Sequence, residues 1–281
     1  MRVIIVGCGY VGGELLRRLR AAGRDALGVR RSASEGCLSA NVLDLSSLRR
    51  ALPAGPADLV YAVSPNERSD EGYERAYVSG LKNALSAVDA RRVVLVSSSG
   101  VVPASGGAWV DEKTPITLDE RASFSARRLR EGERVALGRG GSVLRLTGIY
   151  GPGRDRLLRS VASGDARIPK ETLYTNRIHR DDAAAMAAHL LELPRPAPVY
   201  FGTDTVAATY AEVLTFIAGE LGVPVPPEGP ASRRSNKRVS GAAMVRSGFR
   251  HRFPTYREGY AAMIAERREE YARLADEAAN R

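Results

Sequence analysis

The stretch Val3-Ile4-Ile5-Val6-Gly7-Cys8-Gly9-Tyr10-Val11-Gly12-Gly13 joins a short β-branched run to a GxGxxG turn, and Glu14-Leu15-Leu16-Arg17-Arg18-Leu19 continues it with a helical pattern. A strand, a glycine turn and a helix in this order can hold a pyrophosphate, because the helix N-terminus offers free N–H groups and a positive dipole end. We therefore predict a dinucleotide site at Gly7, Gly9, Tyr10, Val11 and Gly12. A glycine-rich turn without a ligand is the alternative.

Each glycine of the turn has its own predicted role. Gly7 permits the tight turn, Gly9 lets the backbone approach the phosphates, and Gly12 or Gly13 lets the helix pack close to the strand. Because the chain has 28 glycines, the motif alone is a weak signal. The prediction depends on the strand before it and the helix after it.

The chain of 281 residues has an ordinary apolar share of 44% and a net charge of +10. Only Lys82, Lys113, Lys170 and Lys237 are lysines, so almost all of the 42 basic residues are arginines. They are scattered, with the densest cluster at 233–238, and no nucleic-acid motif accompanies them. We therefore expect no nucleic-acid partner; an anionic small-molecule ligand would account for part of the excess.

Targeting signals and metal motifs are not found in the sequence. No apolar run reaches the ~18 residues that a membrane span needs, and Met1 directly precedes a predicted core strand. We therefore expect a cytoplasmic protein without a signal peptide or membrane contact. Cys8 and Cys37 are too few for a disulfide framework, and Cys8 is expected to be a small packing residue. The three histidines are isolated and no CxxC is present, so we predict no metal site.

Strands and helices alternate through the first half of the chain. Strands are predicted at 3–6, 25–29, 59–62, 93–96 and 142–146, and helices at 11–22, 71–88 and 121–137. This alternation predicts an α/β fold with a doubly wound, mainly parallel sheet. In such a sheet, ligands bind beyond the carboxyl ends of the strands.

After Gly151-Pro152-Gly153, helices alternate with Pro-rich loops instead. Helices are predicted at 154–163, 180–193, 210–221 and 255–274. We predict a dinucleotide-binding domain over 1–150 and a smaller α/β substrate-binding part over 151–281. Segments near 180–201 are candidates to return to the first domain.

The end of the second strand bears on the choice of coenzyme. An Asp or Glu there usually holds a free ribose 2′-hydroxyl, but this chain has Gly28-Val29-Arg30-Arg31-Ser32. Two guanidiniums and a hydroxyl suit a 2′-phosphate. We predict that Arg30, Arg31 and Ser32 make NADP(H) preferred over NAD(H), with two solvated surface arginines as the alternative.

Further coenzyme contacts are predicted after the next strands. Asp44 could accept from the adenine amino group or cap the helix at 46–52, and both interpretations stay open. Ala62, Val63 and Ser64 follow the fourth strand, where small residues would let the ribose and phosphates pass.

Six segments, taken in order, resemble the extended or atypical short-chain dehydrogenases/reductases of the NAD(P)-dependent epimerase/dehydratase family. They are 3–13, 59–64, 77–83, 93–101 (VVLVSSSGV), 145–153 (RLTGIYGPG) and 176–182 (NRIHRDD). The resemblance covers nearly the whole chain and implies a Rossmann domain with a small C-terminal substrate domain. Family members are often dimers through two long helices, which makes a homodimer through 71–88 and 121–137 an expectation.

The resemblance also implies site residues. Ser98 matches the Ser or Thr that hydrogen-bonds a substrate hydroxyl or carbonyl, with Ser99 one residue away. A serine turn that satisfies local backbone is the alternative. Ile149 and Tyr150 fall on the loop that lies against the nicotinamide, where their backbone groups could bind its carboxamide.

Three more residues fall where the family lines or closes its substrate pocket. Arg177 and His179 match the lining segment, although His179 could be structural and Asp181 could cap the next helix. Lys237 lies in a C-terminal segment that in the family closes over the substrate, so it could bind a phosphate or carboxylate. A solvated loop is the alternative for Lys237.

The sequence departs from the family at its acid/base pair, a Tyr and Lys spaced YxxxK on one helical face. The lysine charge lowers the pKa of the tyrosine so that the phenol can exchange a proton. The corresponding helix reads SFSARRLRE at 123–131, without Tyr or Lys. Tyr150, Tyr174 or His179 could supply the proton instead.

Two functions therefore stay open. The first is an NADP(H)-binding, epimerase/dehydratase-like oxidoreductase that acts on a small polar or nucleotide-linked substrate without the usual Tyr/Lys pair. The second is a catalytically silent NADP(H)-binding redox sensor.

Overall fold

The computed structural model describes residues 1–32, 34, 36–118, 122–230 and 236–280. Within this part of the chain, seven strands form one parallel sheet in the order β12-β7-β5-β4-β1-β2-β3. They are β1 (Arg2–Val6), β2 (Ala26–Arg30), β3 (Cys37–Ser39), β4 (Pro56–Tyr61), β5 (Asp89–Ser98), β7 (Ser142–Leu146) and β12 (Val199–Gly202). The order reverses between β1 and β4, which makes the carboxyl end of β1 the topological switch point.

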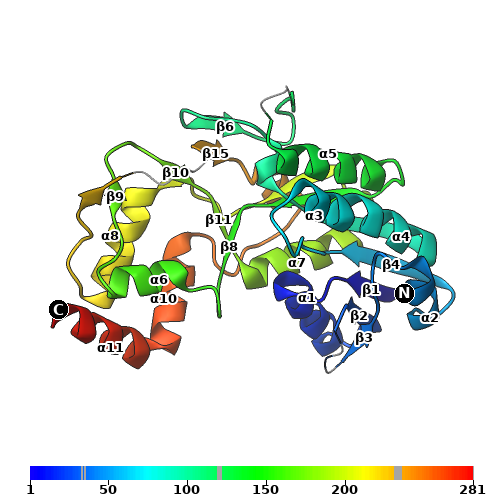
Figure 1. Cartoon of the computed structure of the whole chain (residues 1–281), viewed down its shortest axis with the longest axis horizontal. Helices are drawn as coiled ribbons and strands as arrows, with labels where there is room; N and C mark the ends of the chain where they lie inside the picture. The colour runs from blue at the N-terminus through cyan, green and yellow to red at the C-terminus, as the bar shows by residue number, and fades with distance from the viewer. Residues whose placement is uncertain (33, 35, 119–121, 231–235, 281) are drawn as a thin grey trace.

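Helices cover both faces of the sheet (Figure 1), and the alternation along β1 shows why. Val3 and Ile5 belong to one core with α1 (Tyr10–Ala21) and α7 (Arg180–Glu192). Ile4 and Val6 belong to the core on the opposite face. Helices α2 (Leu45–Ala51), α4 (Gly80–Ala87) and α5 (Phe124–Leu137) cover that face. The predicted doubly wound α/β fold is therefore confirmed.

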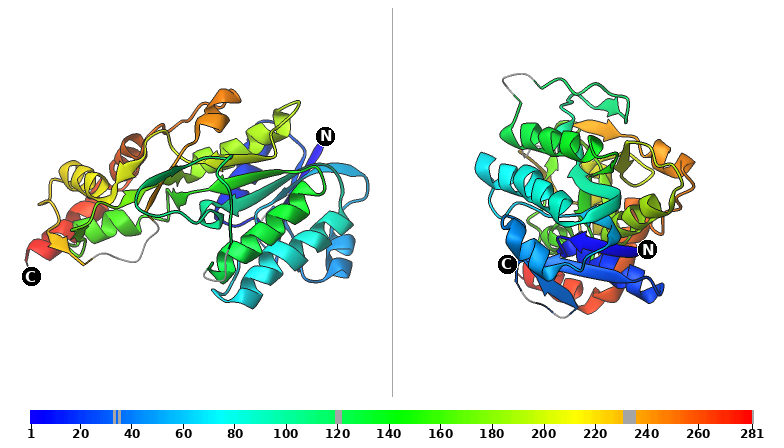
Figure 2. Two further views of the ribbon diagram at one scale, coloured as in Figure 1. Left: turned by 90° about the horizontal axis from the view of Figure 1, so that it is seen from above. Right: turned by 90° about the vertical axis from the view of Figure 1, so that its right-hand side faces the viewer.

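A smaller lobe carries the C-terminus, and Figure 2 shows the two termini at opposite ends of the molecule. Its apolar core is built by α6 (Arg156–Ala162), α8 (Tyr210–Leu221), α10 (Tyr256–Glu266) and α11 (Arg268–Ala279). Asp155 fixes the start of α6 to the two C-terminal helices, because its Oδ2 accepts from Arg267 at 2.9 Å and from the Tyr271 hydroxyl at 3.0 Å.

Short two-stranded ladders lie outside the main sheet. They are β6 (Ala108–Val110) with β15 (Lys237–Val239), β8 (Gly148–Tyr150) with β11 (Arg177–His179), β9 (Ile168–Pro169) with β14 (Glu228–Gly229), and β10 (Tyr174–Thr175) with β13 (Ala208–Thr209). A short helix, α9 (Ala242–Arg246), packs on the sheet lobe through Met244. Segments distant in sequence thus meet beside the carboxyl ends of the main strands.

Two predicted helices are wrong in detail, and the strand β3 was not predicted, because its three residues are too few to give a clear sequence pattern. The helix predicted at 71–88 is interrupted: α3 (Asp70–Glu74) and α4 are joined by a π-helical turn at Arg75–Ser79, where the Tyr61 hydroxyl donates to the Ala76 carbonyl at 2.6 Å. The helix predicted at 255–274 is α10 and α11, broken where Arg267 turns to bind Asp155.

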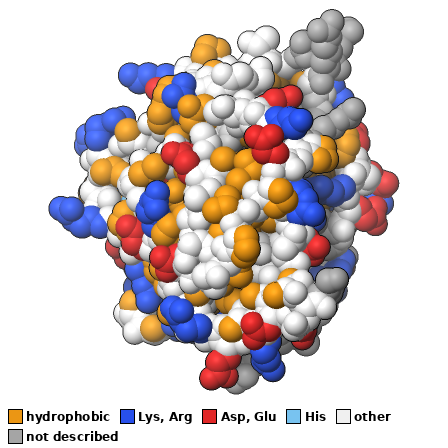
Figure 3. Space-filling view, turned by 90° about the vertical axis from the view of Figure 1, so that its left-hand side faces the viewer, with side chains coloured by type: hydrophobic (Ala, Val, Ile, Leu, Met, Phe, Trp, Pro, Cys, Tyr) orange, Lys and Arg blue, Asp and Glu red, His pale blue; other side chains and the backbone are white. Residues whose placement is uncertain are grey.

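The surface has no single basic stripe on the face shown in Figure 3, where Lys and Arg side chains are spread singly among acidic and hydrophobic ones. The predicted basic cluster at 233–238 falls partly outside the described residues, which exclude Arg233, Arg234 and Ser235. Among the described helices, none combines the length and apolar character needed to cross a membrane.

Candidate functional site

The glycine turn after β1 is held against two neighbouring strands. The amides of Gly7 and Cys8 both donate to the Val29 carbonyl, at 2.9 and 3.1 Å. Gly7 has φ +102°, and a Cβ there would lie 2.6 Å from the Ala62 carbonyl carbon and from the Val63 nitrogen. Glycine is therefore required at this position for two reasons: the positive φ, and the close approach of the chain that follows β4.

Gly12 and Gly9 differ in the space that is available to a side chain. A Cβ on Gly12 would lie 2.2 Å from the Gly7 carbonyl oxygen, so close packing of α1 on the turn requires glycine. A Cβ on Gly9 would meet nothing within 4 Å and would enter open space. The first turn of α1 also has no acidic residue and no side-chain cap. This open cradle at free helix N–H groups fits a pyrophosphate.

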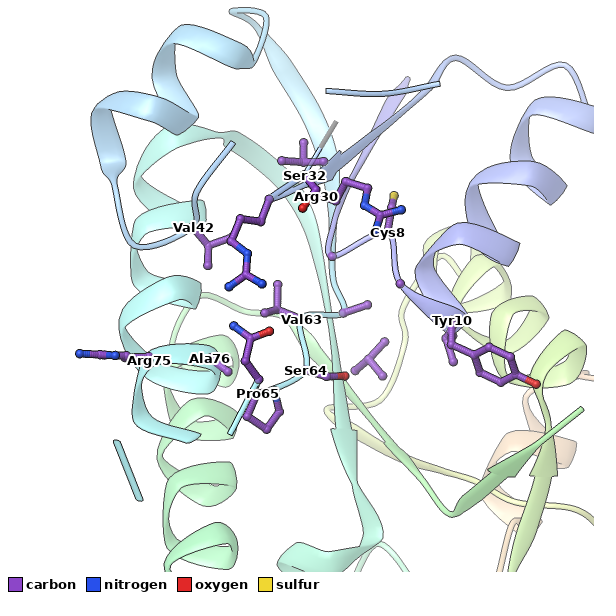
Figure 4. A pocket seen from close by; sticks show the side chains of 18 of the residues that line it. Cys8, Tyr10, Arg30, Ser32, Val42, Val63, Ser64, Pro65, Arg75 and Ala76 are labelled. Carbon is purple, nitrogen blue, oxygen red and sulfur yellow. The ribbon is translucent and has the colours of Figure 1, made fainter. Parts of the chain in front are cut away.

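A cavity of about 520 Å³ lies over this turn, at the switch point of the sheet. Its walls come from residues 7–11, 29–32, 40–43, 62–67, Gly72, Arg75, Ala76, Val96, Ile149 and Arg154. In Figure 4, Val63, Ser64 and Pro65 lie between α1 and the helix that carries Ala76. The structure thus brings the glycine turn and the residues predicted after three different strands to one elongated cavity.

Arg30, Arg31 and Ser32 line one end of this cavity, and all three are exposed. Their backbone is anchored on β3 and its continuation, because the Arg30 carbonyl accepts from Ala40 N at 3.0 Å and the Arg31 carbonyl from Ser39 Oγ at 3.0 Å. Because the backbone is fixed and the side chains are exposed to solvent, these residues can reach a phosphate.

Asp44 has the capping role. Its carboxylate accepts from Ser47 N at 3.1 Å at the N-cap of α2, and it is not among the described residues that line the cavity. Of the two interpretations left open by the sequence, the structure shows the helix cap.

Sequence reasoning missed two arginines on the cavity wall, Arg75 and Arg154. The Arg154 guanidinium lies 4.2 Å from the ring centroid of Tyr10, whose hydroxyl donates to the Pro152 carbonyl at 2.9 Å. Arg154 directly follows the Gly-Pro-Gly turn, which was the available signal for it. These contacts tie the loop after β8 to the start of α1 across the cavity.

Ser98 ends β5 with its Oγ accepting from Gly100 N at 3.1 Å, so the hydroxyl proton stays available for a ligand oxygen. The Ser99 carbonyl accepts from Lys237 Nζ at 2.6 Å. The preceding serine, Ser97, was not predicted: its buried hydroxyl donates to Glu133 Oε1 at 2.9 Å. Ser98 and Ser99 are both half-buried, and neither is among the described residues that line the cavity over the glycine turn.

Tyr150 and His179 do not lie on the cavity wall, in contrast to the sequence expectation of proton donors. Tyr150 is 5% exposed, and a Cβ on Gly259 would lie 1.9 Å from its hydroxyl oxygen. Burial raises the pKa of this phenol far above its usual value. His179 caps α7 by accepting from Asp181 N at 3.2 Å, and burial lowers its imidazole pKa. Of residues 147–152, only Ile149 is among the described residues that line the cavity over the glycine turn.

Arg177 and Lys237 are both buried, and their contacts are internal. Arg177 donates to the Tyr260 hydroxyl at 3.1 Å and to Thr175 Oγ1. Lys237 is 2% exposed and lines a different, second cavity beside the loop that follows Ser98. Arg177 therefore links β11 to α10 of the smaller lobe, whereas Lys237 borders the second cavity.

Two pairs on α5 could correspond to the family's Tyr and Lys, namely Phe124 with Arg128 or Ser125 with Leu129, and the first pair makes structural contacts. Phe124 packs edge-on against Tyr73, with ring centroids 5.6 Å apart. Arg128 makes a two-pronged ion pair with Asp70 of α3, at 2.8 and 2.9 Å. This pairing raises the pKa of the guanidinium and lowers that of the Asp70 carboxyl. None of these three groups can take over proton exchange.

A parallel sheet with a glycine turn at its switch point and an elongated cavity above it defines a dinucleotide-binding α/β protein. The sequence profile of the NAD dependent epimerase/dehydratase family matches residues 3–199. The chain belongs to this family. A search of curated proteins finds no match.

Several solved structures are similar to this protein over nearly the whole chain. A Methylobacillus flagellatus protein described as a candidate NAD-dependent epimerase/dehydratase is 34% identical, with 95% of this chain and 98% of that chain covered and a TM-score of 0.80. The human epimerase family protein SDR39U1, solved with NADPH, is 19% identical over 94% and 99% of the chains, with a TM-score of 0.78. MoeE5, in complex with UDP-glucose and NAD, is 25% identical over 96% and 99%, with a TM-score of 0.74.

Proposed function

We propose that this protein is an NADP(H)-dependent oxidoreductase of the epimerase/dehydratase family that acts on a small polar or nucleotide-linked substrate. The observation that carries the proposal is the cavity over the glycine turn. One end of it has the open cradle at Gly9, and the other has Arg30, Arg31 and Ser32. The cradle suits the pyrophosphate of either nicotinamide coenzyme.

The charge distribution supports the phosphorylated coenzyme. The described cavity lining includes four arginines, and its single acidic residue, Glu67, follows β4 rather than β2. A carboxylate at the end of β2 would repel a 2′-phosphate, whereas guanidiniums bind it with charge-assisted hydrogen bonds. Similar structures contain NADPH in one case and NAD in another, so the preference is argued from this chain's own residues.

Titration of NADPH and NADH tests the coenzyme assignment. We expect wild type to bind NADPH at least about tenfold more tightly, and Arg30→Ala to lose this preference, since a charge-assisted hydrogen bond is worth about 1.5–3 kcal/mol. Arg139→Ala, an exposed arginine in the turn after α5, is the charge-matched control and should leave the preference unchanged. Equal wild-type affinities for the two coenzymes would contradict the proposal.

The residues that would serve catalysis are few. The bound nicotinamide coenzyme would supply or accept a hydride. Ser98 would donate its free hydroxyl proton to a substrate carbonyl or hydroxyl oxygen and so orient the reacting carbon. Tyr150 and His179 are packed away from the cavity, so solvent or the substrate itself would exchange the remaining proton.

The absence of an exchangeable phenol on α5 supports a second candidate, a redox sensor that binds NADP(H) without turnover. NADPH oxidation measured against aldehydes, ketones and sugar nucleotides separates the two. Turnover that is lost in Ser98→Ala, with NADPH affinity unchanged, supports the enzyme. Tight NADPH binding without turnover of any of these substrates supports the sensor.

A further inference from the structure

A second cavity, of about 460 Å³, opens where the loop after β5 meets the first turn of α5. Gly100 and Val102 contribute one wall, and Ser123 and Ala126 contribute another. Lys237, brought in by β15, completes the lining. The loop wall begins two residues after Ser98, so the cavity adjoins the residue proposed to hold the substrate.

The Lys237 ammonium is buried and is bound by two backbone carbonyl groups. Its Nζ donates to the Ser99 carbonyl at 2.6 Å and to the Val102 carbonyl at 2.7 Å. An ammonium has three N–H donors, and these two bonds use two of them. No ion pair to Lys237 is found within the described residues, although the side chain is 2% exposed.

The charged neighbours of Lys237 among the described residues do not offset its positive charge. Burial lowers the pKa of Lys237 to about 8, and the positive charge of Arg145 contributes to the same shift. Arg145 is itself neutralised by Glu133, with bonds of 2.9 and 2.7 Å. The first turn of α5, which forms the opposite wall, has no acidic residue to offset the positive end of the helix dipole. Two carbonyl dipoles offset only part of the cost of burying a cation.

We propose that this cavity binds an anionic group of the substrate, a carboxylate or a phosphate, through the remaining donor of Lys237. The identity of the bound molecule as the substrate rests on the proposed function, whereas the anion site itself does not. The anion would supply the missing negative charge and lie beside the loop that Lys237 ties to Ser98. The protein would thus select substrates with an acidic group close to the reacting carbon.

The small number of lysines allows a direct test. Lys82, Lys113 and Lys170 are exposed, so protein labelled with ¹³C only at lysine gives one buried and three exposed side-chain NMR signals. Lys237→Met identifies the signal of Lys237. Lys170→Met is the matched control, and the Lys237 signal should keep its wild-type position in it.

The titration uses wild type saturated with NADPH, which blocks phosphate binding in the coenzyme cavity, at constant ionic strength. Sodium acetate and inorganic phosphate are the probes, and neutral acetamide is the control. We expect the Lys237 signal to move saturably with acetate, phosphate or both, while acetamide leaves it in place. The anion that acts identifies the substrate group as carboxylate or phosphate.

A Lys237 signal that shows no saturable shift with either anion would overturn the proposal. The wild-type titration requires no mutant, so it stays decisive even if Lys237→Met fails to fold. Failure of the proposed function is read separately, from the NADPH affinity. Protein that does not bind NADPH but still gives the Lys237 response contradicts the coenzyme assignment and keeps the anion site.

Discussion

At the residue scale, the two glycines of the turn that differ most are Gly9 and Gly12. Gly12 is required by the protein's own packing, whereas a Cβ on Gly9 would meet nothing within 4 Å. We predict that Gly9→Ala folds with wild-type stability but binds NADPH about tenfold or more weakly, a loss of about 1.4 kcal/mol or more. The added methyl would occupy the place of the phosphates.

Fluorescence titration with NADPH and a thermal melt measure the two quantities. Gly219→Ala is the matched control, because a Cβ on this exposed α8 glycine also meets nothing within 4 Å. It should keep NADPH affinity. Wild-type affinity in Gly9→Ala would show that the coenzyme phosphates lie elsewhere.

The two cysteines lie together, which the sequence did not indicate. A Cβ on Gly28 would be 2.5 Å from Cys8 Sγ and 2.7 Å from Cys37 Sγ, so the sulfurs are no farther apart than the sum of these distances. Both are free thiols, and burial raises the Cys8 pKa to about 12. Because the thiolate is the reactive form, we predict that Cys8 stays unmodified near neutral pH.

A thiol-reactive dye that absorbs on reaction should therefore modify at most one thiol in native protein and both in urea. Cys37→Ser should make native protein unreactive, and Cys8→Ser should keep the reaction of Cys37. Rapid modification of native Cys37→Ser would contradict the burial of Cys8.

At the element scale, α5 is joined to the sheet by a buried ion pair. Glu133 is fully buried on α5 and binds Arg145 of β7 through both carboxylate oxygens, with Ser97 of β5 as a further donor. Glu133→Gln would leave the Arg145 charge buried and unpaired, which costs about 3–5 kcal/mol. Urea unfolding should show this loss. Glu131→Gln on the same helix removes only the exposed pair with Arg128, worth up to about 1 kcal/mol, and serves as the control.

The elements that the sequence predicted well are those with a local signal. Apolar β-branched runs located β1 and β7, and a capped amphipathic pattern located α8. The interruption at Arg75–Ser79 and the break at Arg267 depend on partners distant in sequence, Tyr61 and Asp155. No local pattern records such contacts.

The same distinction holds for the candidate site. The glycine turn is a local motif, so its residues were found in sequence and lie on the cavity wall. Tyr150 and His179 were placed in the site by resemblance, but the packing of Gly259 and Phe253 against their rings directs them into the core. Lys237 was found as a candidate, but its buried, carbonyl-bound position depends on β15 pairing with β6.

At the scale of the whole molecule, Asp204 lies where the two lobes join. It follows β12 of the sheet lobe, its amide donates to the Arg177 carbonyl at 2.7 Å, and its carboxyl lies beside the backbone amides of Val206 and Tyr256, which favour its charged form. Tyr256 begins α10 of the smaller lobe. Burial, only partly opposed by the charge of Arg177, raises the Asp204 pKa to about 8. This buried carboxyl therefore makes the stability of the joined lobes depend on pH.

The sign follows from comparing the folded and unfolded chains. Unfolded Asp204 ionises near pH 3.9, whereas the folded protein keeps the proton until about pH 8. Between these values unfolding releases a proton, so the stability contributed by Asp204 is complete below the lower pKa and is lost as pH rises through the upper one.

Asp204→Asn keeps a neutral acceptor for the two amides and should lack this loss. We predict that the variant gains stability over wild type as pH rises from about 5 to about 8, measured as the difference in urea midpoint. Asp276→Asn, at an exposed position of α11, should give a difference that does not change with pH. Parallel pH curves for wild type and Asp204→Asn would show that Asp204 is ionised in the folded protein, and that another group sets the pH response of the junction.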